Sequence, residues 1–339
     1  MNILGIETSC DECSISVVRN GKEILSNVVA TQIEHHAPWN GVVPEIASRL
    51  HVEWIDTVCG QALSLAGLSL EEGIDGIAVT SRPGLIGSLL VGLSYAKGLA
   101  WAAGKPWVGV DHIMAHLYAP LLEYDLEYPY IGLIVSGGHT IICRVDNFDK
   151  IEVLGTTIDD ACGEAFDKVA KHYGMGYPGG VHLDQLAEKG RDDAFQFPQP
   201  SLHKGNHSYD VSYSGLKTAA VNQLEQFQTE GAEINNENIA ASFRKAAIDM
   251  LVNRLERAVH DTGIRYAAAG GGVSANRYLR RVLSEKNDFQ TCFSSLPLCT
   301  DNGAMIAGLG YHYLLKGEQS ALSLNAQART SGFRRKYPA

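Results

Sequence analysis

Hydrophobic and polar residues follow the same order in two parts of the chain. Residues 2–25 comprise an apolar run, a small polar turn, an alternating apolar run and a glycine-containing hairpin that leads into another strand. Residues 130–154 repeat this order, with Ser-Gly-Gly-His as the turn. Apolar runs and period-two alternation bounded by turn residues are typical of β-strands. The pattern therefore predicts two lobes that each open with a three-stranded meander.

The segments between and after the two repeats alternate between helical and strand-like patterns. Strands are expected at "GIAVTS" (76–81) and "WVGVD" (107–111), and a third strand before the glycines at 270–272 is expected to turn directly into a helix. Helical patterns cover 44–66, 85–103, 159–174 and 236–261. This alternation indicates an α/β protein.

Length and composition limit the class of protein. A chain of 339 residues usually forms two domains, and 45% hydrophobic with 19% charged residues is typical of a globular protein. The longest apolar tract, 84–104, contains Lys97 and five glycines, which favours a buried helix over a membrane span. The N-terminus lacks the basic region of a signal peptide, so we expect a cytoplasmic protein with no membrane association.

Charge and cysteine usage exclude two further classes. A net charge of −10 is unlike that of a stand-alone nucleic-acid binder, so a polyanionic partner would need a local basic patch or a helper protein. Seven scattered cysteines without an export signal argue against a disulfide framework. Cys10 and Cys13 form a lone C-x-x-C pair, which we interpret as packing residues.

A pair of histidines suggests a metal site. His112 and His116 lie four residues apart in "DHIMAHL" (111–117), so a helix would place both imidazoles on one face, close enough to share one metal ion. The alternative is a pair of ordinary histidines, one bonded to a backbone carbonyl and one facing water. Asp301, just before a small-residue helix in "LCTDNGAMIAG" (298–308), is a candidate third ligand, although it could instead cap that helix. Two histidines and a carboxylate would form an open site for zinc or ferrous iron.

Two glycine turns could approach a ligand. Gly270-Gly271-Gly272 follows a strand and precedes a helix whose first turn holds Ser274 and Asn276, and "IVSGGHT" (134–140) joins two strands. Such turns expose backbone N–H groups to an anion, but close packing and an ordinary hairpin explain them equally well. Neither matches a Rossmann or P-loop motif. Asp11 and Glu12 occupy the corresponding turn of the first lobe, where they could move a proton or serve only as turn residues.

Nine motifs occur in one order along nearly the whole chain. The set closely resembles the bacterial tRNA N6-adenosine threonylcarbamoyltransferase family, once labelled a sialoglycoprotein endopeptidase. The motifs are "GIETSCDE" (5–12), "GVVPEIASR" (41–49), "VDHIMAHL" (110–117), "VSGGHT" (135–140), "DDACGEAFDKVAK" (159–171), "YPGG" (177–180), "SGLKT" (214–218), "AGGGVSANR" (269–277) and "CTDNGAMIA" (299–307).

The resemblance implies a fold and its division. The family has the two-lobed actin-like, sugar-kinase-like ATPase architecture of duplicated RNase H-like lobes with an interlobe cleft, which suits the internal repeat. We expect an N-terminal lobe over 1–117, completed by a C-terminal helix at about 302–322, a C-terminal lobe over 118–301, and a solvated polar tail over 323–339.

The resemblance also implies a reaction and its partners. The family moves the threonylcarbamoyl group from threonylcarbamoyl-adenylate to the N6 amine of the adenosine 3′ of the anticodon in tRNAs reading ANN codons, and AMP leaves. An inactive paralogue of the same fold and a small P-loop ATPase assemble with the transferase. Candidate tRNA contacts are Arg277, Arg280 and Arg281, with Arg329, Arg334, Arg335 and Lys336 in the tail.

The resemblance also implies the site residues, position by position. His112, His116 and Asp301 match the family's ligands for one divalent metal ion, Fe²⁺ or Zn²⁺. The adenylate contacts match Ile134, Val135, Ser136, Gly137, Gly138, Asp167, Gly180 and Asn276, and Asp184 falls where many relatives have a ribose-binding carboxylate. Asp11 or Glu12 is our candidate general base, with the leaving phosphate as the alternative.

The chain departs from the family pattern at two places. Met114-Ala115 replaces the usual Glu between the histidines, and Arg82-Pro83-Gly84 replaces the usual Gly-Pro-Gly. The sequence argues strongly against a zinc protease, because Ile113 stands where H-E-x-x-H has its catalytic base. The remaining alternatives are a metal-dependent carbamoyltransferase acting on a small molecule and an ATPase or kinase of the same fold.

Overall fold

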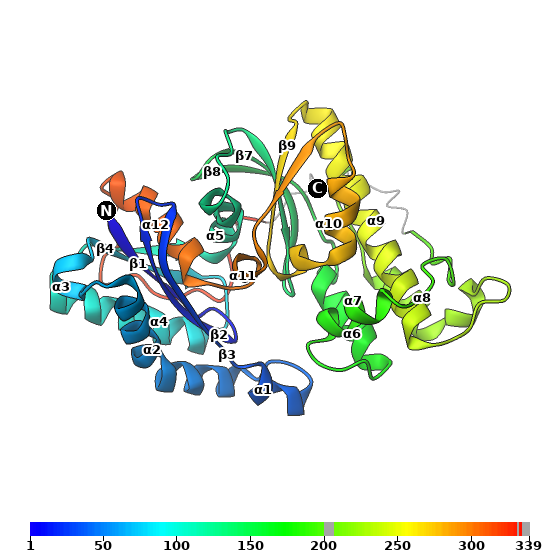
Figure 1. Cartoon of the computed structure of the whole chain (residues 1–339), viewed down its shortest axis with the longest axis horizontal. Helices are drawn as coiled ribbons and strands as arrows, with labels where there is room; N and C mark the ends of the chain where they lie inside the picture. The colour runs from blue at the N-terminus through cyan, green and yellow to red at the C-terminus, as the bar shows by residue number, and fades with distance from the viewer. Residues whose placement is uncertain (200–206, 331, 334–339) are drawn as a thin grey trace. The chain divides into compact units, whose positions relative to one another are not determined.

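The computed structural model describes residues 1–199, 207–330 and 332–333. The chain forms two compact units. Unit 1 comprises Met1–Asp125 and Ser294–Gly332, and unit 2 comprises Leu126–Phe293. Each unit is built around one five-stranded sheet (Figure 1).

The sheet of unit 1 combines an antiparallel meander with two parallel strands. Its order is β3-β2-β1-β4-β5, in which β4 pairs parallel with β1 and β5 parallel with β4. Burial on both faces explains the near-continuous apolar runs of the central strands. The strands are β1 (Asn2–Glu7), β2 (Glu12–Arg19), β3 (Glu23–Thr31), β4 (Gly76–Arg82) and β5 (Trp107–Asp111).

The sheet of unit 2 has the same connectivity. Its order is β10-β9-β6-β7-β8, with an antiparallel β6-β7-β8 meander and β9 parallel to β6. The predicted duplication is therefore confirmed, because each repeat forms three consecutive strands in the same arrangement. The strands are β6 (Tyr130–Val135), β7 (Thr140–Asn147), β8 (Lys150–Thr156), β9 (Tyr266–Gly270) and β10 (Gln290–Phe293).

Helices cover the sheet of unit 1. Helix α12 packs directly on β1, because Gly5 allows an approach that a side chain would block: a Cβ there would lie 2.2 Å from the Gly303 carbonyl oxygen. The α-helices of this unit are α1 (Ile33–His36), α2 (Pro44–Ala66), α3 (Leu70–Gly73), α4 (Ile86–Ala103), α5 (His112–Tyr118), α11 (Leu296–Cys299) and α12 (Gly303–Leu315).

Helix α4 forms from the long apolar tract. It is the one helix among the described residues that is long and apolar enough, by length and composition, to cross a membrane. One face of α4, with Leu89, Leu93 and Ala96, is buried, and the helix packs on α2 and β4. The buried face of α4 agrees with the expectation of a core helix.

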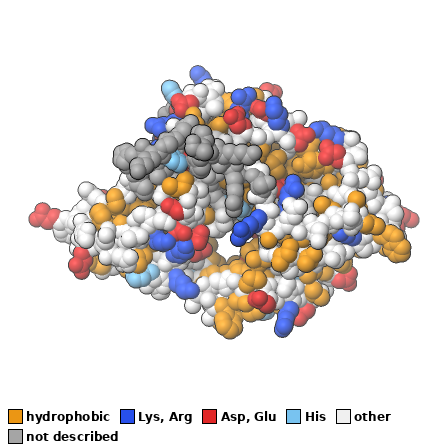
Figure 2. Space-filling view, turned by 180° about the vertical axis from the view of Figure 1, so that it is seen from behind, with side chains coloured by type: hydrophobic (Ala, Val, Ile, Leu, Met, Phe, Trp, Pro, Cys, Tyr) orange, Lys and Arg blue, Asp and Glu red, His pale blue; other side chains and the backbone are white. Residues whose placement is uncertain are grey.

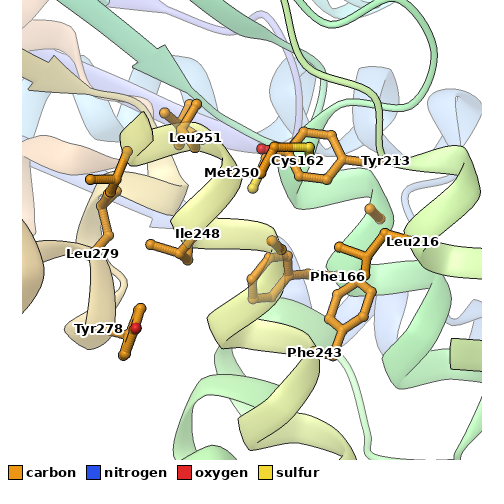
Figure 3. Close-up of a cluster of buried hydrophobic side chains, with 14 of the residues drawn as sticks. Cys162, Phe166, Tyr213, Leu216, Phe243, Ile248, Met250, Leu251, Tyr278 and Leu279 are labelled. Atoms are coloured by element: carbon orange, nitrogen blue, oxygen red, sulfur yellow. The ribbon is translucent and has the colours of Figure 1, made fainter. Parts of the chain in front are cut away.

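Unit 2 has a larger aromatic core. Phe166 and Phe243 meet edge to face with ring centroids 5.4 Å apart, and Tyr213 and Leu216 lie beside them (Figure 3). The α-helices that contribute to this core are α6 (Cys162–His172), α7 (Gly179–Ala187), α8 (Ser214–Asn222), α9 (Asn236–Thr262) and α10 (Arg277–Ser284).

Two sequence expectations need correction. The strand β9 does not turn directly into a helix: a 3-10 turn, Gly272–Ala275, follows it, and α10 begins only at Arg277 with Asn276 as its cap. The segment after residue 323 was expected to be a solvated tail, but its first residues pack against unit 1. Leu324 and Ala326 pack on the core of unit 1, and the Gln327 N–H donates to the Ser81 carbonyl at 3.0 Å. Apolar residues at alternate positions of this polar segment explain its docking.

Candidate functional site

Helix α5 carries both candidate metal-binding histidines. It begins where β5 ends, and the Asp111 side chain caps it by accepting from the N–H groups of Ile113 at 3.0 Å and Met114 at 3.3 Å. The predicted helix places the rings of His112 and His116 side by side, with centroids 4.6 Å apart. Both side chains are almost completely buried, unlike ordinary surface histidines.

Asp301 lies against the two histidines. Its Oδ1 is 3.0 Å from His116 Nε2 and 3.5 Å from His112 Nε2. Asn302, not Asp301, caps α12 by accepting from the Met305 N–H, so capping does not explain the aspartate. The candidate ligand atoms of the three residues all lie within 4.8 Å of one another. The residues nominated from the sequence therefore gather into one group able to hold a metal ion.

The donor chemistry of this group fits a divalent transition metal. Two imidazoles and one carboxylate suit zinc or ferrous iron and leave coordination positions open. The Nδ1 atom of His116 is buried and has no hydrogen-bond partner among the described residues. This nitrogen is on the opposite side of the ring from Nε2, which faces Asp301, so the fit to a metal rests on the donor set and not on Nδ1.

Sequence reasoning missed Glu7, which lies behind His112. Its Oε2 is 3.0 Å from His112 Nδ1, and the Ser9 hydroxyl is 3.2 Å from the same nitrogen. Burial alone would raise the pKa of Glu7, but the neighbouring His112 lowers it below its usual range. Burial likewise opposes protonation of His112, yet the charges of Asp301 and Glu7 raise its pKa to about 9. A glutamate ending the buried run "NILGIE" was the available signal.

Asp11 ends the turn between β1 and β2, and Glu12 is the first residue of β2. Two contacts hold this turn: His51 Nε2 lies 2.9 Å from the Cys10 carbonyl oxygen, and the Gln32 N–H donates to the Asp11 carbonyl at 3.0 Å. Burial raises the pKa of Glu12 well above its usual range, and the charge of Asp11 raises it further. Glu12 thus keeps its proton to a higher pH than an ordinary glutamate does.

In unit 2, the candidate adenylate contacts surround the end of β6. Ile134 and Val135 are the last residues of β6, and Ser136, Gly137 and Gly138 form the following turn, closed by a 2.8 Å bond from the Ser136 N–H to the His139 carbonyl. A Cβ atom at Gly137 or Gly138 would meet nothing within 4 Å. No neighbouring atom of the protein therefore excludes a Cβ at these two positions. Close packing within the protein does not explain why they are glycines.

Two other glycines do serve close packing around this turn. A Cβ at Gly163, near the start of α6, would lie 2.8 Å from the Ser136 carbonyl oxygen. Gly271 has φ +90° and a Cβ there would lie 2.5 Å from the Val135 carbonyl oxygen. The start of α6 and the turn after β9 thus both meet the carboxyl ends of parallel strands β6 and β9, the edge at which open α/β sheets commonly bind ligands.

The remaining adenylate candidates form two hydrogen-bonded pairs. The Gly180 N–H at the start of α7 donates to Asp167 Oδ1 at 2.9 Å. Asn276 donates its amide to Asp184 Oδ1 at 2.9 Å and caps α10 by accepting from the Leu279 N–H at 3.0 Å. Asn276 therefore has a structural role that the sequence did not reveal.

Arg244 is a second residue that sequence reasoning missed. This buried side chain on α9 donates to Asp184 Oδ1 at 2.8 Å and to Glu188 Oε1 at 2.5 Å. Asp184 is thereby held from α9 as well as by Asn276. No local pattern links residues 60 positions apart in sequence, so only the tertiary structure could reveal this contact.

Comparisons with known proteins place the chain in a family. A family model described as tRNA N6-adenosine threonylcarbamoyltransferase matches residues 23–308. A protein of that name from Treponema denticola is 59% identical over 336 residues, covering 99% of each chain. The chain belongs to the tRNA N6-adenosine threonylcarbamoyltransferase family. A member from Borreliella burgdorferi is 53% identical over 337 residues, covering 99% of this chain and 96% of the relative.

Solved structures with low sequence identity share the fold. Component A of (R)-2-hydroxyglutaryl-CoA dehydratase from Acidaminococcus fermentans aligns with a TM-score of 0.55 at 14% identity, over 93% of this chain and 99% of that one. HypF from T. kodakarensis aligns with a TM-score of 0.63 at 15% identity, over 93% of this chain and 48% of that one. The predicted two-lobed α/β fold is confirmed by these likenesses and by the two matching sheets.

The threonylcarbamoyltransferase family model includes both groups of candidate residues. The match begins at residue 23 and ends at 308, so it contains the histidine pair, Asp301 and every candidate adenylate contact. Asp11 and Glu12 precede the matched segment. They lie instead within the full-length similarity to the Treponema denticola member, which covers 99% of this chain.

Proposed function

We propose that this chain transfers the threonylcarbamoyl group from threonylcarbamoyl-adenylate to the N6 amine of the adenosine 3′ of the anticodon in tRNAs that read ANN codons. Family membership over nearly the whole chain is the observation that carries this proposal. The alternatives of a small-molecule carbamoyltransferase and of an ATPase or kinase are not favoured, since the 59% and 53% identical relatives are named for the tRNA reaction.

The proposed reaction is an acyl transfer from a mixed anhydride. The adenosine N6 attacks the carbamoyl carbon, the bond from that carbon to the phosphate oxygen breaks, AMP leaves with the bonding electrons, and N6 loses a proton. Adenine N6 is a weak nucleophile, so positioning of the activated donor accounts for much of the rate. The turn Ser136-Gly137-Gly138 is proposed to present backbone N–H groups to the departing phosphate.

Asp11 and Glu12 are the proposed proton acceptors. Burial and the charge of Asp11 raise the pKa of Glu12, which makes this carboxylate a stronger base than an ordinary glutamate. The two contacts that hold their turn, from His51 and from the Gln32 N–H, limit its movement. The leaving phosphate remains the alternative base.

His112, His116 and Asp301 are the proposed ligands of one divalent metal ion, Fe²⁺ or Zn²⁺. Their clustered donor atoms support this assignment. Such an ion would polarise or orient the threonylcarbamoyl group. The proposed adenylate contacts are Ile134, Val135, Ser136, Gly137, Gly138, Asp167, Gly180, Asp184 and Asn276.

Mass spectrometry of tRNA nucleosides tests the proposed reaction. Depleting the protein from its source cells should remove threonylcarbamoyl-adenosine, and re-expression of the wild-type chain should restore it. An Asp301→Ala chain expressed at the same level should not restore it. Unchanged threonylcarbamoyl-adenosine after complete depletion would contradict the proposal. Because tRNA is the substrate, we place the reaction in the cytoplasm.

An inactive paralogue and a small P-loop ATPase are the proposed protein partners. An unpaired apolar stripe on α4 supports a helical partner: Ile86, Leu90 and Trp101 are exposed, and their spacing places them on one side of the helix. Figure 2 shows hydrophobic side chains gathered over unit 1 on the face seen from behind. Co-purification of the paralogue should be lost in a Leu90→Glu, Trp101→Glu chain, and full retention of the paralogue by this variant would contradict the proposed docking face.

Binding of tRNA is proposed to use a basic group on α10. Arg277 and Arg281 are exposed, whereas Arg280 is half-buried and donates to the Ser274 carbonyl at 2.8 Å. Arg329 is exposed, and the other tail candidates, Arg334, Arg335 and Lys336, lie outside the described residues. Since the chain has a net charge of −10, we propose that partner proteins supply further basic surface. Arg277→Ala with Arg281→Ala should weaken tRNA binding and flatten its salt dependence.

A further inference from the structure

Glu7 is a fully buried carboxylate at the end of β1, directly after the apolar residues Ile3–Ile6. The preceding residues of β1 from Ile3 to Ile6 are buried as well, and Glu7 itself has 0% exposure. A buried carboxylate is costly unless charge and hydrogen bonds compensate it. Its position therefore requires an explanation that packing of the strand does not supply.

The contacts of Glu7 show what this carboxylate does. The Ser9 N–H donates to Oε1 at 2.5 Å, and the Thr80 hydroxyl donates to Oε2 at 2.5 Å. These two donors fix the carboxylate plane, and Oε2 then lies 3.0 Å from His112 Nδ1. Both oxygens accept hydrogen bonds, so the carboxylate is arranged to accept a third from an Nδ1–H group.

The two nitrogens of His112 face different groups. Nδ1 faces Glu7, whereas Nε2 lies 3.5 Å from Asp301 Oδ1, on the side where His116 Nε2 is also found. An Nδ1–H bonded to Glu7 leaves the Nε2 lone pair directed at the metal-binding group. With both histidines neutral, Glu7 and Asp301 together contribute two negative charges, which balance one divalent cation.

We infer that Glu7 is the positioning residue of the metal group, holding His112 in the tautomer that ligates through Nε2 and supplying one of the two balancing charges. This inference rests on the proposed function, because it presumes that the His112, His116, Asp301 group binds a metal. Thr80 acts one step further out, by holding Glu7. Neither residue needs to touch the metal or the substrate.

Metal affinity of the full-length chain tests the inference directly. Dissociation constants for Zn²⁺ and Co²⁺ are measured by competition with a chromophoric chelator, and the Co²⁺ absorption bands report ligand geometry. Loss of a carboxylate that orients a metal-bound histidine typically weakens binding by about 10- to 100-fold. We expect Glu7→Gln to show a loss of this size and shifted Co²⁺ bands, and Glu7→Asp, which keeps the charge, to recover part of the affinity.

Two buried threonines, Thr80 on β4 and Thr8 directly after β1, give a matched pair of control variants. Thr80→Val removes the hydroxyl that holds Glu7, whereas Thr8→Val removes a buried hydroxyl that donates to the Ser88 carbonyl at 3.0 Å instead. Both substitutions replace a threonine hydroxyl with a methyl group, so the change in side-chain shape is the same in the two variants. We expect weaker metal binding in Thr80→Val, by a smaller factor than in Glu7→Gln, and wild-type affinity in Thr8→Val.

The outcomes separate this inference from the proposed function. A wild-type chain that binds neither ion overturns both. A wild-type chain that binds one ion, with a folded Glu7→Gln variant of equal affinity and unchanged Co²⁺ bands, overturns the role of Glu7 alone. If circular dichroism shows that Glu7→Gln does not fold, the Thr80→Val variant decides. The inference is overturned if Thr80→Val binds the metal as tightly as the wild type does. It is also overturned if Thr80→Val and Thr8→Val lose metal affinity to the same extent.

Discussion

Arg82 Nε lies 3.0 Å from Asp111 Oδ2, so an ion pair joins the end of β4 to the residue that caps α5. Arg82 is one of the two places where the chain departs from the pattern of its family. The other oxygen of Asp111 accepts from the first N–H groups of α5, the helix that carries His112 and His116. Arg82 thus contacts the residue that caps α5, the helix that carries two of the candidate metal ligands.

Asp111→Ala should destabilise the chain more than Arg82→Ala. The arginine is half-exposed, so its ion pair contributes about 0–1 kcal/mol, whereas loss of a capping aspartate costs about 1 kcal/mol in addition to the lost pair. Urea unfolding measures both variants. A larger loss in Arg82→Ala than in Asp111→Ala would show that the cap is not the main contribution of Asp111.

Asp301→Ala should remove the metal without unfolding the chain. The aspartate side chain is partly exposed and does not cap α12, so its removal leaves the helix intact. Elemental analysis should fall from one divalent ion per wild-type chain to almost none, and transfer to tRNA should be abolished. Asn302→Ala is the contrasting variant, since it removes the true cap and should lower stability. Full metal occupancy in Asp301→Ala would contradict the assigned ligand set.

Gly137→Val should weaken adenylate binding while the fold is retained. Apart from its chain neighbours, no atom lies within 4 Å of a Cβ at this position, so the fold leaves room for a side chain that an incoming ligand would then meet. Gly163→Ala provides the opposite case, because its Cβ would lie 2.8 Å from the Ser136 carbonyl oxygen and should lower the melting temperature. Calorimetric titration with a stable threonylcarbamoyl-adenylate analogue measures the affinity. Wild-type affinity in Gly137→Val would show that the phosphate is not bound at this turn.

Asn276→Ser and Asn276→Ala should separate the two roles of this residue. Serine retains an acceptor that can cap α10, but it loses the amide that donates to Asp184; alanine loses both. We expect both variants to weaken binding of the analogue to a similar extent, with alanine less stable by about 1 kcal/mol. If only the alanine variant loses affinity, Asn276 acts through the helix cap and not through its amide.

His51 should make the chain less stable in mild acid. Burial lowers the pKa of His51, and the hydrogen bond to the Cys10 carbonyl opposes this only in part. The folded chain therefore keeps His51 neutral at a pH where the unfolded chain, with an ordinary histidine pKa of about 6.5, already takes up a proton. Stability is unaffected above that pH and falls as the pH drops below it.

The His51→Gln variant measures this contribution. Its urea midpoint should depend less on pH between about 6.5 and 5 than that of the wild type. His260→Gln, which changes a 91% exposed side chain, is the control and should leave the slope unchanged. Equal slopes in wild type and His51→Gln would exclude His51 as the source of acid sensitivity.

The sequence by itself determined the features that depend on local periodicity. Alternating apolar positions predicted both meanders, and the four-residue spacing of His112 and His116 predicted their shared helical face, because neighbours along a helix or strand are set by its repeat. Asp301, which lies 185 residues from His116, was a candidate from its place before a small-residue helix, and the family resemblance matched it to a ligand. The same local reasoning placed the start of α10 too early, since glycines permit a 3-10 turn as readily as a helix start.

Only the tertiary structure decided which distant groups support these residues. Glu7 meets His112 because β1 lies one strand away from β5 across β4, and Arg244 meets Asp184 because α9 packs on α7. Such contacts depend on strand order and helix packing, and these arise from burial of many side chains at once. A single polar residue in an apolar run, such as Glu7, indicates that a partner is needed, and the fold determines which partner it meets.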